Sequence, residues 1–395
     1  MSNPISTTPL EPANPTTRST AKKLKHHQET AEHHHHESLL PGLPDHIAQL
    51  CLSLVPPSIL YSVCHSWRRL IYSPSFPPFL SLYALIVPTE TQIHNSNSVE
   101  LCSFDPISRI WHLLPPPPSD PPLRFLFRHP SFISRKLPIQ SVAVSGNLVV
   151  LAATDDSFLP ALSEPLIFNP LSKNWEYGPP LSAPRRWCAA GASRGSVYVA
   201  SGMGSHYNTD VARSIEKLDL ECSEKSGDER RRRRVWREMG KLKDGKFSRD
   251  AIEAVGWRGK LCMVNVKGDA AKEGIIYDVE TDCWEEMPEG MLAGWRGPAA
   301  AMDEETIYVV DESKGLLKKY DHVNDAWVDV AENYRLKGAQ QVAAAGGKVC
   351  VLCADGVSIT VVDVAAPPPV RLWVVDVPAG IQIVGVHILP RMIHS

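Results

Sequence analysis

The 395-residue sequence lacks any long uninterrupted run of apolar residues. Charged residues, Gly or Pro interrupt every candidate stretch before it reaches the roughly 18 residues that a bilayer-crossing helix needs. The N-terminal stretch MSNPISTTPLEPANP also lacks the basic start and the apolar segment of a secretory signal peptide. Both absences predict a soluble protein with no membrane partner.

The sequence also lacks a strong excess of one charge and a cysteine framework. Its 41 Lys and Arg residues and 44 Asp and Glu residues give a formal net charge of -3, which predicts no general attraction to nucleic acid. The nine cysteines are an odd number at scattered positions, so we expect free thiols in a reducing compartment. These features predict a location in the cytoplasm, the nucleus or both.

Recognisable catalytic motifs are missing as well. We find no nucleophile, base and orienting residue at a known spacing, no Gly-rich phosphate loop and no Cys/His zinc pattern. The sequence therefore predicts no catalytic residue, no metal site and no cofactor. Because residues distant in sequence can meet in a fold, an enzyme site built by the fold stays an open alternative.

Residues 1–38 are rich in Ser, Thr, Pro and His and contain almost no large apolar side chains. A segment of this composition cannot bury enough apolar surface to offset the entropy lost on ordering. We therefore expect residues 1–38 to form a disordered tail.

Four short stretches repeat nearly the same pattern, with an Asp or Asn six positions before a Trp. They read FDPISRIW at 104–111, FNPLSKNW at 168–175, YDVETDCW at 277–284 and YDHVNDAW at 320–327. An Asp or Asn side chain can accept hydrogen bonds from backbone N–H groups two residues later, so each stretch is typical of a strand, a turn and a second strand. Two degenerate copies, LDL before Trp236 and VDV before Trp373, bring the total to six.

A second pair of strand-like runs precedes most copies, with small residues in the first run and β-branched or aromatic residues in the second. Examples are AAGASRGSVYVASG at 189–202 and AAAMDEETIYVV at 299–310. The first unit, which begins with SLYALIV at 81–87, lacks the small-residue run, whereas IQIVGVHIL at 381–389 is an unused strand. If the two ends pair, the mainly β fold is a closed six-bladed β-propeller over residues 81–390.

Residues 40–71, LPGLPDHIAQLCLSLVPPSILYSVCHSWRRLI, have a helical pattern instead. Pro44 and Asp45 indicate a helix start, and Pro56 indicates its end. The apolar residues between them cover almost the whole circumference, which predicts a helix that is buried on every side. A second short helix, with apolar residues on one face, follows. Helices of about ten residues are marginal alone, so this pair needs a partner surface.

This segment resembles an F-box, and the repeats resemble kelch repeats, a combination found in plant F-box/kelch proteins. LPDHIAQLCLSLVP and VCHSWRRLI carry the first resemblance, although Leu50 and Leu54 occupy positions where polar residues are common. The Trp half of the repeats carries the second, because the kelch diglycine is reduced to Ser201-Gly202 in one unit. The resemblance implies an F-box at 39–76 followed by a kelch-type propeller at 81–390.

In that family the F-box binds a Skp-type adaptor, which connects the chain to the cullin and RING subunits of an SCF-type ubiquitin ligase. The resemblance implies that six residues form or support the adaptor-facing surface and that Trp67 holds the helices together. The six are Leu43, Pro44, Ile47, Cys51, Leu52 and Val55. Apolar anchors at helical spacing suit binding in a groove. The alternative is a helical hairpin packed on the propeller's own outer wall.

The target protein would bind the propeller. Arg and aromatic residues dominate interaction hot spots, and several stand just before small-residue strands, at positions that open onto one rim of a propeller. The predicted target-binding residues are Arg185, Arg186, Trp187, Arg249, Trp295 and Arg296. Packing or simple solvation is an equally good reading of each. The run from Arg230 to Arg234 is either a nuclear-import patch or a solvated hairpin tip.

The sequence thus favours the substrate-recognition subunit of an SCF-type ubiquitin ligase, which does no bond chemistry itself. An alternative is a propeller enzyme or small-molecule-binding protein that acts on a sugar-like metabolite in the central channel, since fold does not fix function. A second alternative is a scaffold that uses the same two modules without a ligase.

Overall fold

A computed structural model describes thirteen stretches of the chain. They are residues 38–55, 57–71, 73, 76, 79–89, 98–124, 139–155, 157–220, 234–248, 251–267, 270–353, 356–367 and 369–391. The tail predicted at 1–38 lies outside the described residues except for Ser38, and so do Arg249 and residues 230–233 of the Arg run.

Three short helices precede the strands. They are α1 (Asp45–Ser53), α2 (Pro57–Val63) and α3 (His65–Ile71). Pro44 is the N-cap of α1, and Pro57 begins α2, where the fixed φ of Pro and its missing N–H suit a first helical position. The sequence predicts one helix after Pro56, but the structure has two, because α2 ends at Val63 and α3 begins at His65. Beside the break, the Arg68 side chain donates a hydrogen bond to the Tyr61 carbonyl, near the end of α2.

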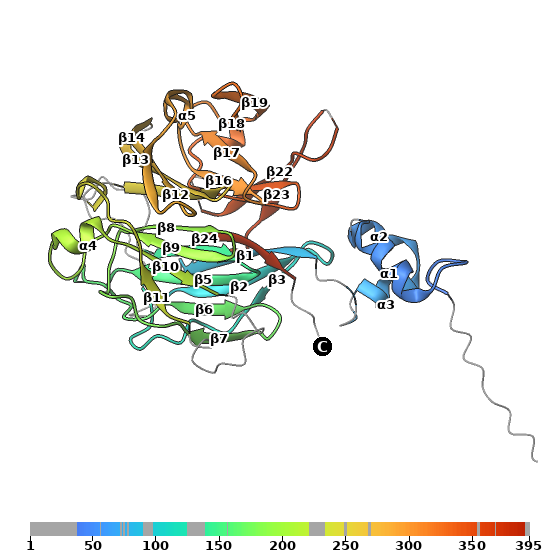
Figure 1. Ribbon diagram of the computed structural model, residues 1–395. Coiled ribbons are helices and arrows are strands. Elements are labelled where there is room, and N and C mark those ends of the chain that lie inside the picture. The colour runs from blue at the N-terminus through green and yellow to red at the C-terminus, as the bar shows by residue number, and fades with distance from the viewer. Residues whose placement is uncertain are drawn as a thin grey trace, which may run out of the picture.

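The described strands form six four-stranded antiparallel sheets, which confirms the predicted blades (Figure 1). Blade 1 contains β24 (Ile381–Pro390), β1 (Leu80–Pro88), β2 (Glu100–Asp105) and β3 (Ile110–Leu113). Blade 2 contains β4 (Ile139–Val144), β5 (Asn147–Ala153), β6 (Leu166–Asn169) and β7 (Asn174–Tyr177). Blade 3 contains β8 (Ala189–Ser193), β9 (Ser196–Ala200), β10 (Ile215–Asp219) and β11 (Trp236–Glu238).

The remaining blades follow the same order from the inside to the outside. Blade 4 contains β12 (Ala251–Trp257), β13 (Lys260–Lys267), β14 (Ala270–Asp278) and β15 (Cys283–Glu286). Blade 5 contains β16 (Ala299–Met302), β17 (Thr306–Asp311), β18 (Leu316–Asp321) and β19 (Ala326–Glu332). Blade 6 contains β20 (Gln341–Ala345), β21 (Lys348–Leu352), β22 (Ser358–Asp363) and β23 (Arg371–Asp376).

The innermost strands form a closed ring. Each of β4, β8, β12, β16, β20 and β24 contacts the innermost strand of the next blade, and β24 contacts β4. Short helices in the connections are α4 (Thr209–Arg213), α5 (Glu289–Gly294) and the 3₁₀ turns at Lys246–Ser248 and Tyr334–Leu336. Within the described stretches, no helix is long and apolar enough to span a membrane.

The C-terminal strand fills the place that the first unit leaves empty, as the sequence predicts. β24 pairs antiparallel with β1 along its length. The Tyr83 hydroxyl donates to the Pro390 carbonyl at 2.7 Å, and Arg391 forms a buried ion pair with Asp105 at 3.1 Å. The two ends of the propeller sequence therefore hold one blade together.

The repeated Asp or Asn forms the turn that its position predicts. Asn169 Oδ1 accepts from Leu171 N at 2.8 Å, and Asp278 Oδ1 accepts from Glu280 N at 2.9 Å. The same side-chain bond to the residue two positions later recurs in blades 1, 5 and 6. This turn fixes where the outermost strand begins, and therefore which of its faces meets the neighbouring blade.

The repeated Trp residues connect neighbouring blades. In five blades the indole N–H donates to a carbonyl at the end of the preceding blade, at 2.8–2.9 Å. The donors are Trp111, Trp175, Trp236, Trp284 and Trp327, and the acceptors are the carbonyls of Asp376, Pro115, Pro179, Gly240 and Met291, respectively. These five Trp residues therefore pack between neighbouring blades.

Blade 6 departs from the predicted pattern. Asp363 pairs with Arg371 and Val362 with Leu372, so Leu372 occupies the register position that Trp holds in the other blades. Trp373 is one residue further along β23, and a shift of one residue moves a side chain to the other face of a strand. The assignment of Trp373 as the sixth repeat Trp is therefore wrong, and its side chain is 42% exposed.

The apolar core lies between the blades. Six of the clusters of buried apolar side chains each combine residues of two neighbouring blades, from blades 1 and 2 around to blades 6 and 1. A seventh cluster holds the N-terminal helices together. Burial between blades fixes the ring and leaves its two rims, where the loops lie, open for other functions.

Candidate functional site

The N-terminal helices have a small core of their own. Leu52 of α1, Leu60 of α2 and Leu70 of α3 are buried against one another. Trp67 is half-buried against this cluster, and its indole N–H donates to the Leu39 carbonyl at 2.9 Å. The implied role of Trp67 in holding the segment together therefore has a specific contact.

The outer face of these helices is apolar and exposed. Its members are large apolar side chains that are at least one-third exposed: Leu43 39%, Ile47 37%, Leu50 59%, Leu54 87%, Ile59 52%, Tyr61 39% and Val63 53%. The prediction that α1 is buried on every side is thus wrong for the chain alone, because only Ala48 and Leu52 of α1 are buried. An exposed apolar patch of this kind is typical of an interaction site.

The six residues implied for the adaptor surface divide into two groups. Leu43, Pro44, Ile47 and Cys51 are exposed on the outer face, whereas Leu52 is buried and Val55 is half-buried beneath it. Leu52 and Val55 therefore support the face from inside. Leu50 and Leu54, which stand where polar residues are common, extend the same exposed apolar surface.

The helices contact the ring at one rim. Ile107, in the turn between β2 and β3, packs against the helical core. Phe79, just before β1, lies 5.0 Å below the Arg391 guanidinium, and its carbonyl accepts from Arg391 N at 2.6 Å. The alternative of a hairpin packed on the outer wall does not describe this arrangement, because the large apolar face stays uncovered.

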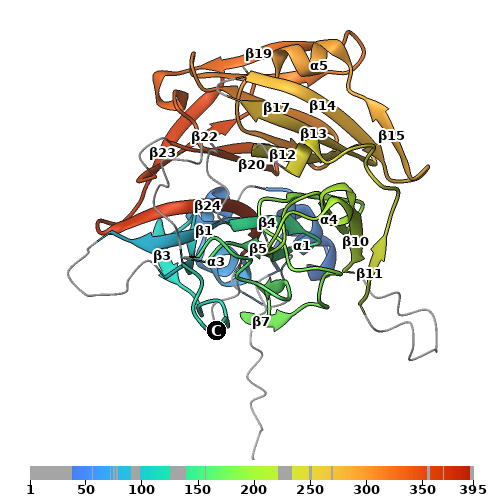
Figure 2. The ribbon, with the colours of Figure 1, turned by 90° about the vertical axis from the view of Figure 1, so that its left-hand side faces the viewer.

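Two rims can be defined from the strand order. We call the rim where the innermost strands begin the start rim, and the rim that carries the turn between β2 and β3 the turn rim. The N-terminal helices adjoin the turn rim (Figure 1). Figure 2 looks onto the start rim, with the helices behind the ring. A partner on the start rim and a partner on the helices would therefore face opposite directions.

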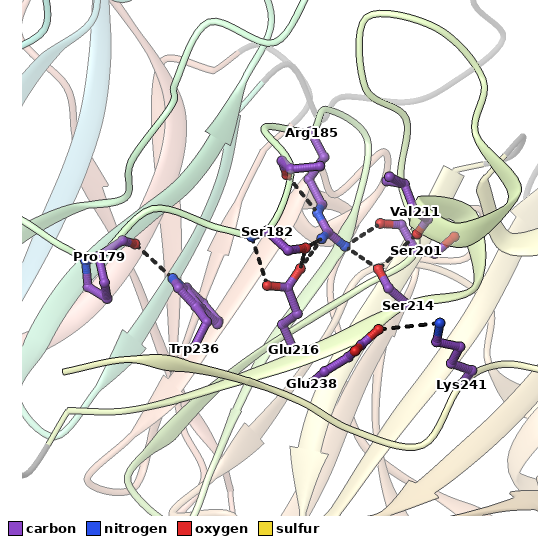
Figure 3. Close-up of polar contacts among 11 residues, drawn as sticks. Pro179, Ser182, Arg185, Ser201, Val211, Ser214, Glu216, Trp236, Glu238 and Lys241 are labelled. Atoms are coloured by element: carbon purple, nitrogen blue, oxygen red, sulfur yellow. Dashed lines mark hydrogen bonds and ion pairs between the residues drawn. The ribbon is translucent and has the colours of Figure 1, made fainter.

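Arg185 lies at the start rim but inside the protein. Its guanidinium forms a buried ion pair with Glu216 and donates to Ser214 Oγ at 2.8 Å and to the Ser201 carbonyl at 3.2 Å (Figure 3). Glu216 also accepts from Ser182 N at 3.0 Å. Since Arg185 is only 1% exposed and fully occupied, it stabilises blade 3 and offers nothing to a target.

Trp295 is also inside the protein. It is 1% exposed, its indole N–H donates to Glu253 Oε2 at 3.1 Å, and its ring meets Trp327 edge to face at 6.1 Å. It therefore packs between blades 4 and 5. Arg296, the next residue, is exposed at the start rim.

Arg186 and Trp187 lie together at the junction of blades 2 and 3. The Arg186 guanidinium stacks on the Trp187 ring at 4.1 Å, and Trp187 is half-buried with φ 55°. Arg186 is 8% exposed, and its Nε and Nη1 atoms have no hydrogen-bond acceptor among the described residues. Burial lowers the pKa of Arg186, and the nearby charge of Asp155 opposes this shift.

Sequence reasoning missed a second Arg and aromatic pair on the start rim. Tyr334 is 71% exposed, and Arg335 lies over its ring at 5.6 Å and donates from Nε to its hydroxyl at 3.1 Å. The pair lies in the connection that leads into the small-residue strand β20, as Arg186 and Trp187 lie in the connection that leads into β8. The same positional signal could have found it.

The central channel contains a cavity of about 330 Å³ lined by the innermost strands. Most lining residues are small, with polar groups such as Gln140, Gln341 and Gln382 among them. Ser141 Oγ lies 2.9 Å from His387 Nε2, but burial lowers the pKa of His387 to about 4, which makes it a weak base. In the described stretches, no three His, Cys, Asp or Glu residues could share a metal ion.

Comparisons with known proteins identify two informative relatives. The chain is 52% identical over 362 residues to the F-box/kelch-repeat protein SKIP25 of Arabidopsis thaliana, and the match covers 90% of each chain. It is 22% identical over 300 residues to the F-box protein AFR of the same plant, which covers 70% of this chain and 69% of the relative. No protein-family profile matches the chain.

Proposed function

The chain belongs to the F-box/kelch-repeat family, and on this premise we propose that it is the substrate-recognition subunit of an SCF-type ubiquitin ligase. In this proposal the exposed face of α1 and α2 binds a Skp-type adaptor, and through it the cullin and RING subunits. The propeller binds a target protein, which is then ubiquitinated and degraded.

The observation that carries the proposal is the uncovered apolar face of the helices. Leu50, in the second half of α1, is 59% exposed, and Leu54, just after α1, is 87% exposed. Both are exposed although the three helices have a buried core of their own. Such side chains are unfavourable in water and suit an apolar partner surface. Helical anchors that insert into a groove are a recurring mode of protein recognition.

The position of the helices supports a receptor that holds two proteins at once. The helices adjoin the turn rim, which leaves the start rim free for a target. Holding target and enzyme in one assembly raises the effective concentration of target lysines near a ubiquitin-charged enzyme. In this proposal the chain contributes to ubiquitination by proximity alone.

Adaptor binding tests the proposal. We expect Leu50→Asp combined with Leu54→Asp to abolish capture of the purified adaptor, because two charges replace exposed apolar anchors. These positions are better than Leu52, whose burial means that a charge there would unfold the helices. Leu113→Asp is the matched control, since Leu113 is 68% exposed on the outermost strand of blade 1.

Undiminished capture of the adaptor by the double variant would contradict the proposed function, provided that circular dichroism shows the double variant and the Leu113→Asp control to be folded. Recovery of adaptor without any cullin from cells would instead favour a scaffold that works outside a ligase. Co-purification of the cullin with the wild-type chain, and its loss in the double variant, is the expected result.

A further inference from the structure

Buried polar side-chain atoms without a hydrogen-bond partner are concentrated at one place in the described structure. Four of them, Arg186 Nε and Nη1, Thr154 Oγ1 and Ser201 Oγ, belong to the start rim at the junction of blades 2 and 3. Native proteins leave few such groups, so a local concentration needs an explanation.

The backbone brings these residues together. Arg186 exchanges both backbone hydrogen bonds with Met203, two residues after Ser201, at 2.8 and 2.9 Å. Thr154 directly precedes Asp155, whose charge is near enough to act on Arg186. Thr154 is 2% exposed, Ser201 is fully buried and Arg186 is 8% exposed.

Every unpartnered group in this junction can donate a hydrogen bond. The two guanidinium nitrogens together carry three N–H bonds, and the two hydroxyls can each turn a proton toward an acceptor. Burying a guanidinium with its donors unmade is costly, and the cost disappears when an anion accepts them. The arrangement therefore lacks an acceptor, and a negatively charged one fits best.

The neighbouring acid does not supply that acceptor. Asp155 Oδ1 accepts from the backbone N–H groups of Ser157 at 2.9 Å and Leu159 at 2.7 Å. No ion pair joins Asp155 to Arg186 within the part of the chain that the structure describes. With one positive charge and one acid nearby, the junction suits a single negative charge better than the double charge of a phosphate group.

Two residues near Arg186 have a strained backbone. Trp187 has φ 55° and Ser201 has φ 60°, a region that residues with a side chain rarely adopt. Ser201 stands at the place of the first glycine of the kelch diglycine, where glycine would avoid the strain. Strained residues that the surrounding structure maintains occur at ligand clamps.

We propose that Arg186, with the hydroxyls of Thr154 and Ser201, binds a carboxylate side chain of the target protein. This inference rests on the proposed function and adds the chemistry of the target: an acidic residue that inserts at the junction of blades 2 and 3. Trp187 covers the guanidinium in the free protein and stacks beside the bound carboxylate. Arg186 is thus a recognition residue, whereas its neighbour Arg185 is structural.

The test measures the thermal unfolding temperature of the full-length protein with hexaglutamate as the probe, at constant ionic strength. A ligand that binds only the folded state raises this temperature. We expect hexaglutamate to raise it for the wild type and to bind Arg186→Gln at least about thirtyfold more weakly, the loss typical of removing one partner of a buried charge pair. Hexalysine should have no effect.

Arg335→Gln is the matched control, because Arg335 also lies over an aromatic ring on the start rim but is exposed. It should respond to hexaglutamate as the wild type does. An equal response in Arg186→Gln, no response in the wild type, or a response to phosphate or chloride alone would each overturn the proposal.

A measurement without ligand keeps the test meaningful if a variant misfolds. Arg186→Gln should unfold at or above the wild-type temperature, because it removes a buried charge that has no acceptor. Unfolding at a much lower temperature would make Arg186 structural and overturn the proposal. Adaptor capture by the same preparation separates the two proposals: its failure would count against the proposed function and leave the carboxylate site standing.

Discussion

Arg185 and Arg186 are neighbours in sequence and both are buried, yet their guanidinium groups have opposite surroundings. Arg185 pairs with the buried carboxylate of Glu216. Arg186 stacks on Trp187 and leaves Nε and Nη1 without an acceptor among the described residues. The first arrangement is complete in the free protein, whereas in our proposal a ligand completes the second.

The paired Arg185 predicts a large loss of stability on substitution. Arg185→Gln leaves Glu216 buried without its partner, so we expect the free energy of unfolding to fall by about 3–5 kcal/mol. Urea denaturation measures this value. Arg185→Met with Glu216→Met removes both charges and should lose less; an equal or greater loss would contradict the assigned ion pair.

The indole bonds between blades predict a smaller effect. Trp284→Phe keeps an aromatic ring but removes the pyrrole part of the indole with the N–H that donates to the Gly240 carbonyl, and should lower the free energy of unfolding by at least about 1 kcal/mol. Trp373→Phe is the control, because Trp373 is on the exposed face of β23. Similar losses in both variants would argue against a role for the indole bond.

The ion pair between Asp105 and Arg391 predicts a dependence on pH. Burial alone would raise the pKa of Asp105, but hydrogen bonds from Arg391 and Ser108 outweigh it and hold the pKa below its usual value. The stability from this lowered pKa is therefore present above the unfolded value of about 3.9 and is lost as the pH falls through the lower folded pKa.

Asp105→Asn measures this contribution. We expect a deficit of about 3 kcal/mol relative to the wild type at neutral pH, since Arg391 is left buried without a carboxylate. The deficit should shrink as the pH falls below about 4, because the unfolded wild type takes up a proton there more readily than the folded state does. A deficit that stays constant from neutral pH to pH about 3 would contradict the lowered pKa.

The crowding around the central channel predicts a sharp difference between two glycines of the innermost strands. A Cβ added at Gly256 would lie 1.7 Å from the Ala192 carbonyl oxygen, so Gly256→Ala should destabilise the fold by at least about 3 kcal/mol. At Gly385 the nearest atom is the end of the Leu85 side chain at 3.3 Å, which can move. Gly385→Ala should therefore unfold close to the wild-type temperature.

Much of the ring could be predicted because its turns leave a local signal. A turn in which an Asp or Asn side chain accepts from the backbone two residues later depends only on neighbouring residues. Its spacing to the Trp is therefore visible in the sequence. The register of blade 6 was predicted wrongly, because its longer turn places Trp373 one residue further along the strand. Only the pairing of Val362 with Leu372 shows which face each residue occupies.

The sites were harder to predict, since they depend on contacts between distant residues. No local pattern distinguishes Arg185 from Arg186, because Glu216 lies about thirty residues further along the chain. The exposed face of α1 was misjudged for a different reason. An apolar circumference predicts burial, but it does not say whether the cover comes from the same chain or from another protein.

The pairing of β24 with β1 also sets the order in which parts of the protein can fold during translation. The helices are translated before the ring, and the ring stays open until β24 has been translated. A message cut short before Ile381 would thus yield a product with intact helices and an incomplete first blade. Under the proposed function, such a product would bind the adaptor without a complete propeller to bind a target.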